Sequence, residues 1–150
     1  MNGPAATIRP ALPGDFSEAA GLLRDSGLPL DGLEERFTNA LVASRGERIV
    51  GCVALEVYGD QALLRSLVVA PAHRGNLLGE RLTAEALRLA SERGVRDVYL
   101  LTETAAGFFP RFGFRVEERE SAPDALRESV EFRTACPSSA VMMHARVGNA

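Results

Sequence analysis

The sequence contains no lysine, so all 17 of its basic residues are arginines. This absence fits a codon-usage bias, and we assign it no function. Acidic residues number 20, the net charge is −3, and neither a basic tail nor a long block of like charge is present. Neutralising the phosphates of nucleic acid takes clustered basic side chains. We therefore expect no nucleic-acid partner, although this charge pattern does not exclude one local basic pocket.

Cysteine is nearly absent and long apolar runs are missing. Cys52 and Cys136 lie far apart, which argues against a disulfide scaffold and makes the cytoplasm the expected compartment. The N-terminus has no charged segment followed by an apolar one, so no signal peptide is expected. No apolar run approaches the ~20 residues that span a bilayer, so we expect no membrane partner. Cys, His, Asp and Glu do not cluster at metal-ligand spacing, so we expect no metal site.

What is present suits one globular domain over residues 1–150. A chain of this length buries roughly 68–70% of its unfolded surface, which supports a core without metal or disulfide. Helical spacing of apolar residues predicts helices over 16–27, 31–44 and 77–94, with a short helix over 104–114 and a helix or long turn over 122–132. Strands are predicted over 6–12, 48–59, 60–70, 95–102, 114–120 and 138–147, with a short extra strand near Leu41.

The order of these elements predicts the fold class. Gly59 and Asp60 separate two strands in a hairpin pattern, whereas later strands alternate with helices. This combination predicts a mixed sheet, α+β or α/β, with helices on both faces. Edge strands of such sheets often pair between subunits, so a homodimer is a further expectation.

The turn that joins an apolar strand to the longest helix carries the strongest functional signal. The strand ends near Ala70, and the helix is expected to start near Leu77. Main-chain N–H groups in the first turn of a helix have no intrahelical acceptor and form an anion site together with the helix dipole. The N–H groups expected there belong to Gly75, Asn76, Leu77 and Leu78. Arg74 adds a charged donor, so the turn suits a pyrophosphate; the alternative is an ordinary strand-to-helix connection.

The segment LVVAPAHRGNLLGERLTAEAL, residues 67–87, resembles the acetyl-CoA segment of the GNAT family of N-acetyltransferases. The later AAGFFPRFGF, residues 105–114, resembles the short helix and "GF" strand entry of the same family. This resemblance extends over roughly residues 6–146. It implies the GNAT fold, a mixed, mostly antiparallel sheet with splayed central strands, and acetyl-CoA (coenzyme A) as the cofactor.

Two positions depart from the family pattern. Arg74 and Gly79 match the ends of Arg-x-x-Gly-x-Gly/Ala, but Leu77 replaces the middle glycine. Phe109 stands where the family often has a tyrosine that protonates the leaving thiolate. A phenyl ring cannot donate a proton, so that role is vacant or filled elsewhere. Both departures favour one alternative, a degenerate domain that binds acetyl-CoA without catalysis.

Finer resemblance points to two groups within the family. RGNLLGERL and the C-terminal third are similar to the GNAT domain of bacterial N-acetylglutamate synthase. TAAGFF and EFR…CPSSAV are closer to stand-alone GNAT proteins encoded with arsenic-resistance genes. Both imply acetylation of a small amino-acid-like amine, and the second implies a link to arsenic resistance. The synthase has an arginine where this chain has Thr104, which argues against glutamate as the first choice of acceptor. Glutamate is kept as an alternative, as is a protein or peptide amine.

Acetyl transfer needs a polarised thioester and an acceptor for the amine proton. The resemblance assigns the first role to a main-chain amide near Leu67, Val68 and Val69. Glu56 is the first candidate base, and Glu103, at the end of a buried strand, is the second. Tyr58 is a candidate acid. The competing interpretations are solvated carboxylates, a helix-terminal acid, a packed tyrosine, or a water relay that needs none of these groups.

An amino-acid substrate also needs a cation for its carboxylate. Arg65 is the first candidate, because a charge inside an apolar strand must face solvent or a polar site. Further candidates for binding the acceptor are Thr102, Thr104, Phe132, Arg133, Ser138 and Ser139. Phe108 and Phe109 belong to the core or line the pantetheine channel. Cys136 has no histidine nearby in the sequence, so we predict direct attack in a ternary complex without an acyl-enzyme.

Overall fold

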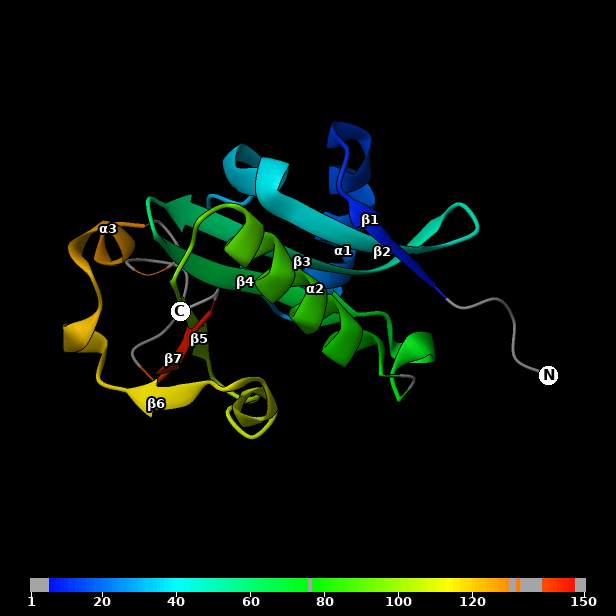
Figure 1. Ribbon diagram of the computed structural model, residues 1–150. Coiled ribbons are helices and arrows are strands. Elements are labelled where there is room, and N and C mark those ends of the chain that lie inside the picture. The colour runs from blue at the N-terminus through cyan, green and yellow to red at the C-terminus, as the bar shows by residue number, and fades with distance from the viewer. Residues whose placement is uncertain (1–5, 76, 130–131, 133–138, 148–150) are drawn as a thin grey trace.

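The structure is a computed structural model that describes residues 6–75, 77–129, 132 and 139–147 (Figure 1). Its strands are β1 (Thr7–Pro10), β2 (Ala40–Arg45), β3 (Arg48–Tyr58), β4 (Gln61–Val69), β5 (Asp97–Thr102), β6 (Arg115–Glu117) and β7 (Val141–Arg146). Its α-helices are α1 (Phe16–Asp25), α2 (Leu78–Glu92) and α3 (Asp124–Arg127). Short 3-10 turns are η1 (Pro13–Asp15), η2 (Glu34–Asn39), η3 (Pro71–His73), η4 (Phe109–Phe112) and η5 (Arg119–Ser121). Within the described ranges, each helix is too short or too polar to cross a membrane.

The described strands form one sheet in the order β1-β2-β3-β4-β5-β7-β6. All neighbouring strands are antiparallel except β4 and β5, which are parallel. This confirms the predicted mixed sheet. Gly59, with φ +64°, lies in the two-residue turn between Tyr58 and Gln61, which confirms the predicted hairpin.

Helices cover both faces of the sheet, as the sequence predicts. Along β2, Leu41 and Ala43 pack on the side of α2, whereas Ala40 and Val42 pack on the side of α1. The amphipathic helix α2 buries Leu82, Ala86 and Ala90 in the first of these cores, and Figure 1 shows it lying across β3 and β4. Because strand side chains alternate between faces, β2 contributes to both cores.

The predicted helix over 31–44 is wrong in its second half. Its first half forms only the 3-10 turn η2, and residues 40–45 are strand β2. The spacing of Leu33, Phe37 and Leu41 matches a helical face, but the alternation in 40–43 serves two opposite cores. Pairing with β1 and β3 therefore prevails over local helical periodicity. The short extra strand expected near Leu41 is confirmed.

Other boundaries differ by smaller amounts. The helix expected over 104–114 reduces to η4, and within 122–129 the expected helix is limited to α3. Asp15 precedes α1, but its carboxylate makes no cap bond to that helix. It accepts hydrogen bonds from Arg9 and from the N–H of Leu12 instead. Gly27 ends α1 as expected, with φ +71° and its N–H donating to Arg24 O at 3.0 Å.

Two irregularities of β4 shape the centre of the molecule. Cys52 pairs with Val68 and Ala54 with Arg65, so Val53 alone faces two residues of β4. This is a β-bulge, and Ser66 in it adopts φ +62°. On its other side, β4 pairs with β5 only from Gln61 to Leu63. Beyond that point the two parallel strands part.

Candidate active site

A cavity of about 590 Å³ occupies the gap between the parted ends of β4 and β5. One wall is β4 from Leu64 to Val69, and the opposite wall is residues 100–105 with Phe109 and Ala140. Residues 26–29, after α1, form a third wall. Main-chain groups of β4 that point away from β3 have no strand opposite them here, so they face the cavity.

A second cavity, of about 220 Å³, lies at the N-terminus of α2. It is lined by Val69, His73, Arg74, Gly75, Leu77, Leu78, Gly79 and Glu80. The helix begins at Leu78, one residue later than expected, so Gly75 and Leu77 precede its first turn. No side chain caps that turn. Of the N–H groups expected in that turn, only that of Leu78 belongs to the helix among the described residues. First-turn N–H groups have no intrahelical acceptor, so this end of α2 is a candidate anion site, which stays a prediction.

Leu77 has an unusual conformation for a non-glycine residue. Its φ is +60° and its ψ is 18°, in the left-handed region, and its side chain is 64% exposed. A side chain in this region costs roughly 1–2 kcal/mol, which explains why glycine is usual at such a position. Gly75 also has a positive φ, +88°, where glycine carries no such penalty.

Arg74 lies between the two cavities and lines both. Its Nε donates to Val69 O at 3.0 Å, and its Nη2 donates to Ser26 Oγ at 3.4 Å. The side chain thus joins the end of β4 to the loop after α1. Since it remains exposed, its guanidinium is accessible to an anion held by the turn.

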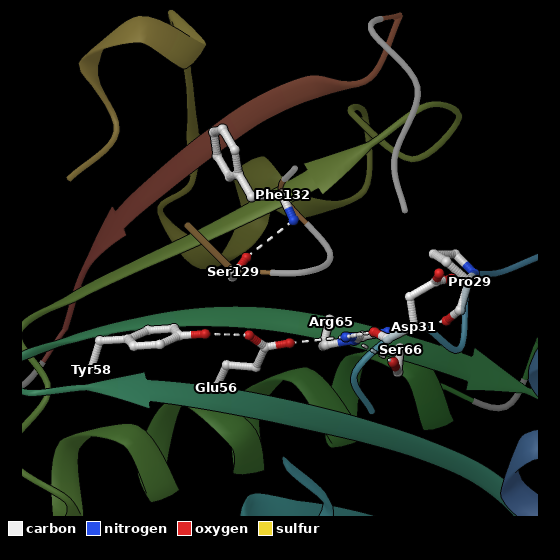
Figure 2. A network of polar contacts seen from close by, with 8 residues as sticks. All are labelled: Pro29, Asp31, Glu56, Tyr58, Arg65, Ser66, Ser129 and Phe132. Atoms are coloured by element: carbon white, nitrogen blue, oxygen red, sulfur yellow. Dashed lines mark hydrogen bonds and ion pairs between the residues drawn. The ribbon is translucent and has the colours of Figure 1, made fainter. Parts of the chain in front are cut away.

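A buried polar network crosses β3 and β4 (Figure 2). Tyr58 OH donates to Glu56 Oε1 at 2.5 Å, and Arg65 Nη1 donates to Glu56 Oε2 at 2.9 Å. The side chains of Glu56 and Arg65 are 3% and 0% exposed. Neither is the solvated surface group that the sequence left open as an alternative. Arg65 borders the large cavity, whereas Glu56 and Tyr58 lie outside its lining.

Glu103 is a carboxylate that lines the large cavity directly, between Thr102 and Thr104. Ser139 Oγ donates to Glu103 Oε1 at 3.2 Å, which brings together two predicted site residues from distant parts of the sequence. Thr102 Oγ1 accepts a hydrogen bond from the N–H of Ala105 at 2.9 Å. This bond fixes the chain where it leaves β5.

The aromatic candidates divide between the site and the core. Phe109 lines the cavity and packs edge-on against Phe114. Phe108 packs on Phe109 and lies close to Gly79 of α2. Phe132 is buried in a separate core with Tyr99 and lies outside the cavity lining. Asn76, Arg133, Ser138 and Cys136, predicted as site or structural residues, lie outside the described residues.

Sequence reasoning missed the loop wall and the bulge. Residues 26–29 line the cavity although they precede the part of β4 that lines it, which begins at Leu64, by more than 30 positions in the chain. The string SGLPL marks a turn after a helix, but the sequence does not show what that turn faces. Ser66, also a lining residue, is a polar side chain next to Arg65 within an apolar strand, and that was the available signal.

Cys52 lies beneath the bulge, and its Sγ donates to Ser66 O at 3.3 Å. Burial raises the pKa of this thiol to about 12, because the apolar surroundings disfavour the thiolate. At neutral pH Cys52 is therefore an uncharged, packed side chain.

Together these features define an α+β domain with an open cleft between parted strands and a candidate anion site beside it. Residues 36–116 match the family model described as an acetyltransferase (GNAT) domain, so the chain belongs to the GNAT acetyltransferase family. The expected fold, a mixed sheet splayed at its centre, is thereby confirmed.

Individual proteins match this chain at low sequence identity and over part of its length. The N-acetyltransferase CT2212 of Chlorobaculum tepidum, described as uncharacterized, is 32% identical over 98 residues, which are 65% of this chain and 63% of that protein. The amino-acid acetyltransferase of Aeromonas salmonicida is 30% identical over 104 residues, 68% of this chain and 23% of that protein. The chain thus spans less than two thirds of the length of these relatives.

A solved structure shows the same fold over almost the whole chain. N-acetylglutamate synthase from Neisseria gonorrhoeae, complexed with coenzyme A and N-acetyl-glutamate, superposes with a TM-score of 0.83. The match covers 99% of this chain and 36% of that one, at 22% sequence identity. At this level of identity the likeness establishes the architecture.

Proposed function

We propose that this domain transfers the acetyl group of acetyl-CoA to the amine of a small amino-acid-like molecule. One observation carries the proposal: the anion site at α2 and the cleft between β4 and β5 meet at Val69 and Arg74. A ligand with a diphosphate at one end and a thioester at the other can occupy both cavities. The family membership of the chain favours acetyl-CoA as that ligand.

The turn before α2 would hold the diphosphate. The N–H groups of the first helical turn supply donors, and Arg74 supplies a charged one. Gly75 and Gly79 have no side chain that would fill the site, and Leu77 and Leu78 complete its lining. Asn76 remains a prediction from the sequence. The pantetheine arm would follow Leu67, Val68 and Val69 of β4, with Phe109 opposite and Phe108 behind it.

The reaction is direct attack in a ternary complex. The neutral amine attacks the thioester carbonyl, and its oxygen becomes an oxyanion as the tetrahedral carbon forms. Main-chain N–H groups of β4 beyond the bulge face the gap and would stabilise that charge. Collapse expels coenzyme A thiolate and leaves the new amide. Cys52, uncharged and buried, is no candidate for an acyl-enzyme.

The proton acceptor is best assigned to Glu103. Its carboxylate lines the cleft, and Ser139 orients it. Glu56 is the competing candidate, but both its oxygens already accept hydrogen bonds from Tyr58 and Arg65. In the same way Tyr58, the candidate acid, directs its hydroxyl to Glu56. Proton delivery to the thiolate by water is the simpler route, since Phe109 has no proton to give.

Recognition of the acceptor would use the polar edge of the cleft. Thr102 and Thr104 line it beside Glu103. Arg65 also borders the cleft, but its guanidinium is buried against Glu56 and loop carbonyl oxygens. Arg133, Ser138 and Phe132 remain predictions from the sequence. The name of the Aeromonas salmonicida relative supports an amino acid as acceptor, with glutamate as one candidate. The arsenic-resistance link rests on the sequence resemblance alone. The cytoplasmic location is an expectation from the scarcity of cysteine, and the homodimer is an expectation from the edge strands of a mixed sheet.

A screen of acetyl transfer tests this proposal. Release of free coenzyme A is followed with acetyl-CoA and a panel of amino acids and short peptides. We expect turnover on at least one free amino acid. Turnover on peptides alone would favour a protein acetyltransferase, and binding of acetyl-CoA without turnover would favour the degenerate domain that Leu77 and Phe109 suggest.

Two variants assign the base in the same assay. Glu103→Gln should lower kcat by about 10²–10⁴-fold, the usual contribution of a general base. Glu56→Gln should lower kcat by much less. The opposite pattern would make Glu56 the base.

A further inference from the structure

We propose that Arg65 is a positioning residue that fixes the loop wall of the cleft, residues 26–29, by bonding to Pro29 and Asp31 at its end, and thereby sets how the acceptor amine is held. The fixing of this wall is a property of the fold, and only its effect on the acceptor rests on the function proposed above. Amide hydrogen exchange tests the fixing of the wall, and kinetics test its effect on the acceptor.

The contacts of Arg65 join the loop to the sheet (Figure 2). Its Nη1 donates to the carbonyl oxygen of Asp31 at 2.5 Å, and its Nη2 donates to that of Pro29 at 3.2 Å. Its Nε donates to Ser66 Oγ, in the bulge, at 3.1 Å. One planar guanidinium therefore connects two loop carbonyls with the strand that faces the thioester position.

Glu56 and Tyr58 offset the desolvation cost of burying the Arg65 guanidinium. A charge that is fully removed from water is costly unless it is paired and hydrogen-bonded. Glu56 supplies the opposite charge at 2.9 Å and is itself held by Tyr58. Apolar residues of similar volume often stabilise a core as well as such a pair does. A role in arranging the loop gives a reason for retaining the pair at this place.

The loop that Arg65 holds is part of the cleft. Ser26, Gly27, Leu28 and Pro29 line the large cavity opposite residues 100–105. Arg74 contacts Ser26 at the end of the loop nearest the anion site, and Arg65 holds the other end. The Arg65 end lies farther from the anion site and thus borders the part of the cleft left for the acceptor.

Arginine is needed for this geometry. Its guanidinium presents five N–H donors in a rigid plane, whereas lysine presents a compact ammonium on a flexible stem. In Arg65→Lys the charge pair with Glu56 is retained, but simultaneous bonds to Pro29 O, Asp31 O and Ser66 Oγ are lost. The substitution therefore separates positioning from charge.

Amide hydrogen exchange measures the loop without any assay of activity. In Arg65→Lys we expect the amides of Leu28 and Leu33, which donate to Leu23 O and Leu30 O, to exchange at least 10-fold faster, with those of α2 unchanged. Arg9→Lys is the matched control, because Arg9 also pairs with a carboxylate, Asp15, but lies outside the cavity lining. An unchanged loop in Arg65→Lys, or equal acceleration in the loop and α2, would overturn the proposal.

Kinetics test the consequence for the acceptor. With the amino acid that the wild type acetylates fastest, Arg65→Lys should raise KM for that amino acid at least 10-fold and leave KM for acetyl-CoA within twofold. Arg9→Lys should change neither. A loosened loop with an unchanged acceptor KM would refute the positioning role. If the wild type acetylates no amine, the proposed function fails, while the exchange data still decide whether Arg65 fixes the wall.

A double variant covers the case in which Arg65→Lys does not fold. Arg65→Met combined with Glu56→Leu removes both charges together and leaves a core of similar volume. We expect a cooperative thermal transition and the same fast exchange at Leu28 and Leu33. Wild-type protection of the loop in this folded variant would show that Arg65 is dispensable and would overturn the proposal.

Discussion

Leu63 and Tyr99 are the last residues paired between β4 and β5, and the two strands separate beyond them. The sheet is therefore continuous at one end of this pair of strands and open at the other. The open end holds the large cavity, and the bulge at Ser66 lies on its wall. The candidate functional site thus lies where the pairing between these two parallel strands stops.

Arg74→Ala should weaken binding of acetyl-CoA. Its guanidinium lies beside the helix N-terminus that would hold the diphosphate, and a hydrogen bond to a charged group is worth about 1.5–3 kcal/mol. Isothermal titration calorimetry should therefore show a Kd raised by about 10- to 150-fold. Arg88→Ala is the control, since Arg88 is exposed on α2, pairs with Glu85 and lines neither cavity. Equal affinities of Arg74→Ala and wild type would mean that the turn does not bind phosphate.

Leu77→Gly should stabilise the protein. Relief of the left-handed conformation gains roughly 1–2 kcal/mol, and the greater backbone freedom of glycine in the unfolded chain returns about 0.5–1 kcal/mol. We expect a net gain of about 0.5–1 kcal/mol in the free energy of unfolding, measured in urea. Leu77→Ala keeps the strained φ and should show no gain. A destabilised glycine variant would show that the exposed leucine makes a stabilising contact.

Asp15→Asn should destabilise the protein at neutral pH and much less in acid. Hydrogen bonds from Arg9, and further from the N–H of Leu12, lower the pKa of Asp15 against the opposing effect of burial. A carboxyl with a lowered folded pKa contributes stability above its unfolded pKa and loses it as pH falls through the folded value. Urea unfolding should show a deficit of about 1–2 kcal/mol at pH 7 that shrinks below about pH 4. A deficit independent of pH would exclude the ion pair as its source.

Cys52 should be inert in the native protein. Burial raises its pKa to about 12, so at pH 8 almost no thiolate is present, and the side chain is 1% exposed. In a Cys136→Ser background, Ellman's reagent should react with Cys52 only after unfolding in urea. Because the folded pKa lies above that of an exposed thiol, Cys52 also reduces stability as pH rises beyond about 9. Rapid labelling under native conditions would contradict the burial and reopen the question of an acyl-enzyme.

Local signals in the sequence were enough to predict several helices, strands and turns. The amphipathic pattern before Gly94 predicts α2, and Gly59 with Asp60 predicts the hairpin, because both depend on residues close together in the chain. The turn around Arg74 and Gly75 was found for the same reason. The helix expected over 31–44 fails where its residues instead enter a sheet and pack on two cores.

The features that could not be predicted from the sequence depend on strand register and on contacts between distant segments. The bulge at Ser66 arises from the way β3 and β4 pair, and a one-residue shift would turn Arg65 away from Glu56. The loop wall at residues 26–29 faces the cleft through contacts with β4 and Arg74. Glu103 and Ser139 were each predicted as site residues, but only the fold brings them within 3.2 Å.

The most direct test of the account is a crystal structure of the protein with acetyl-CoA. We expect the diphosphate within hydrogen-bonding distance, about 2.7–3.2 Å, of main-chain N–H groups at the start of α2. The acetyl group should lie between β4 and β5, beyond the last pair, Leu63 and Tyr99. Acetyl-CoA bound elsewhere, or an empty turn in crystals saturated with acetyl-CoA, would contradict the central claim.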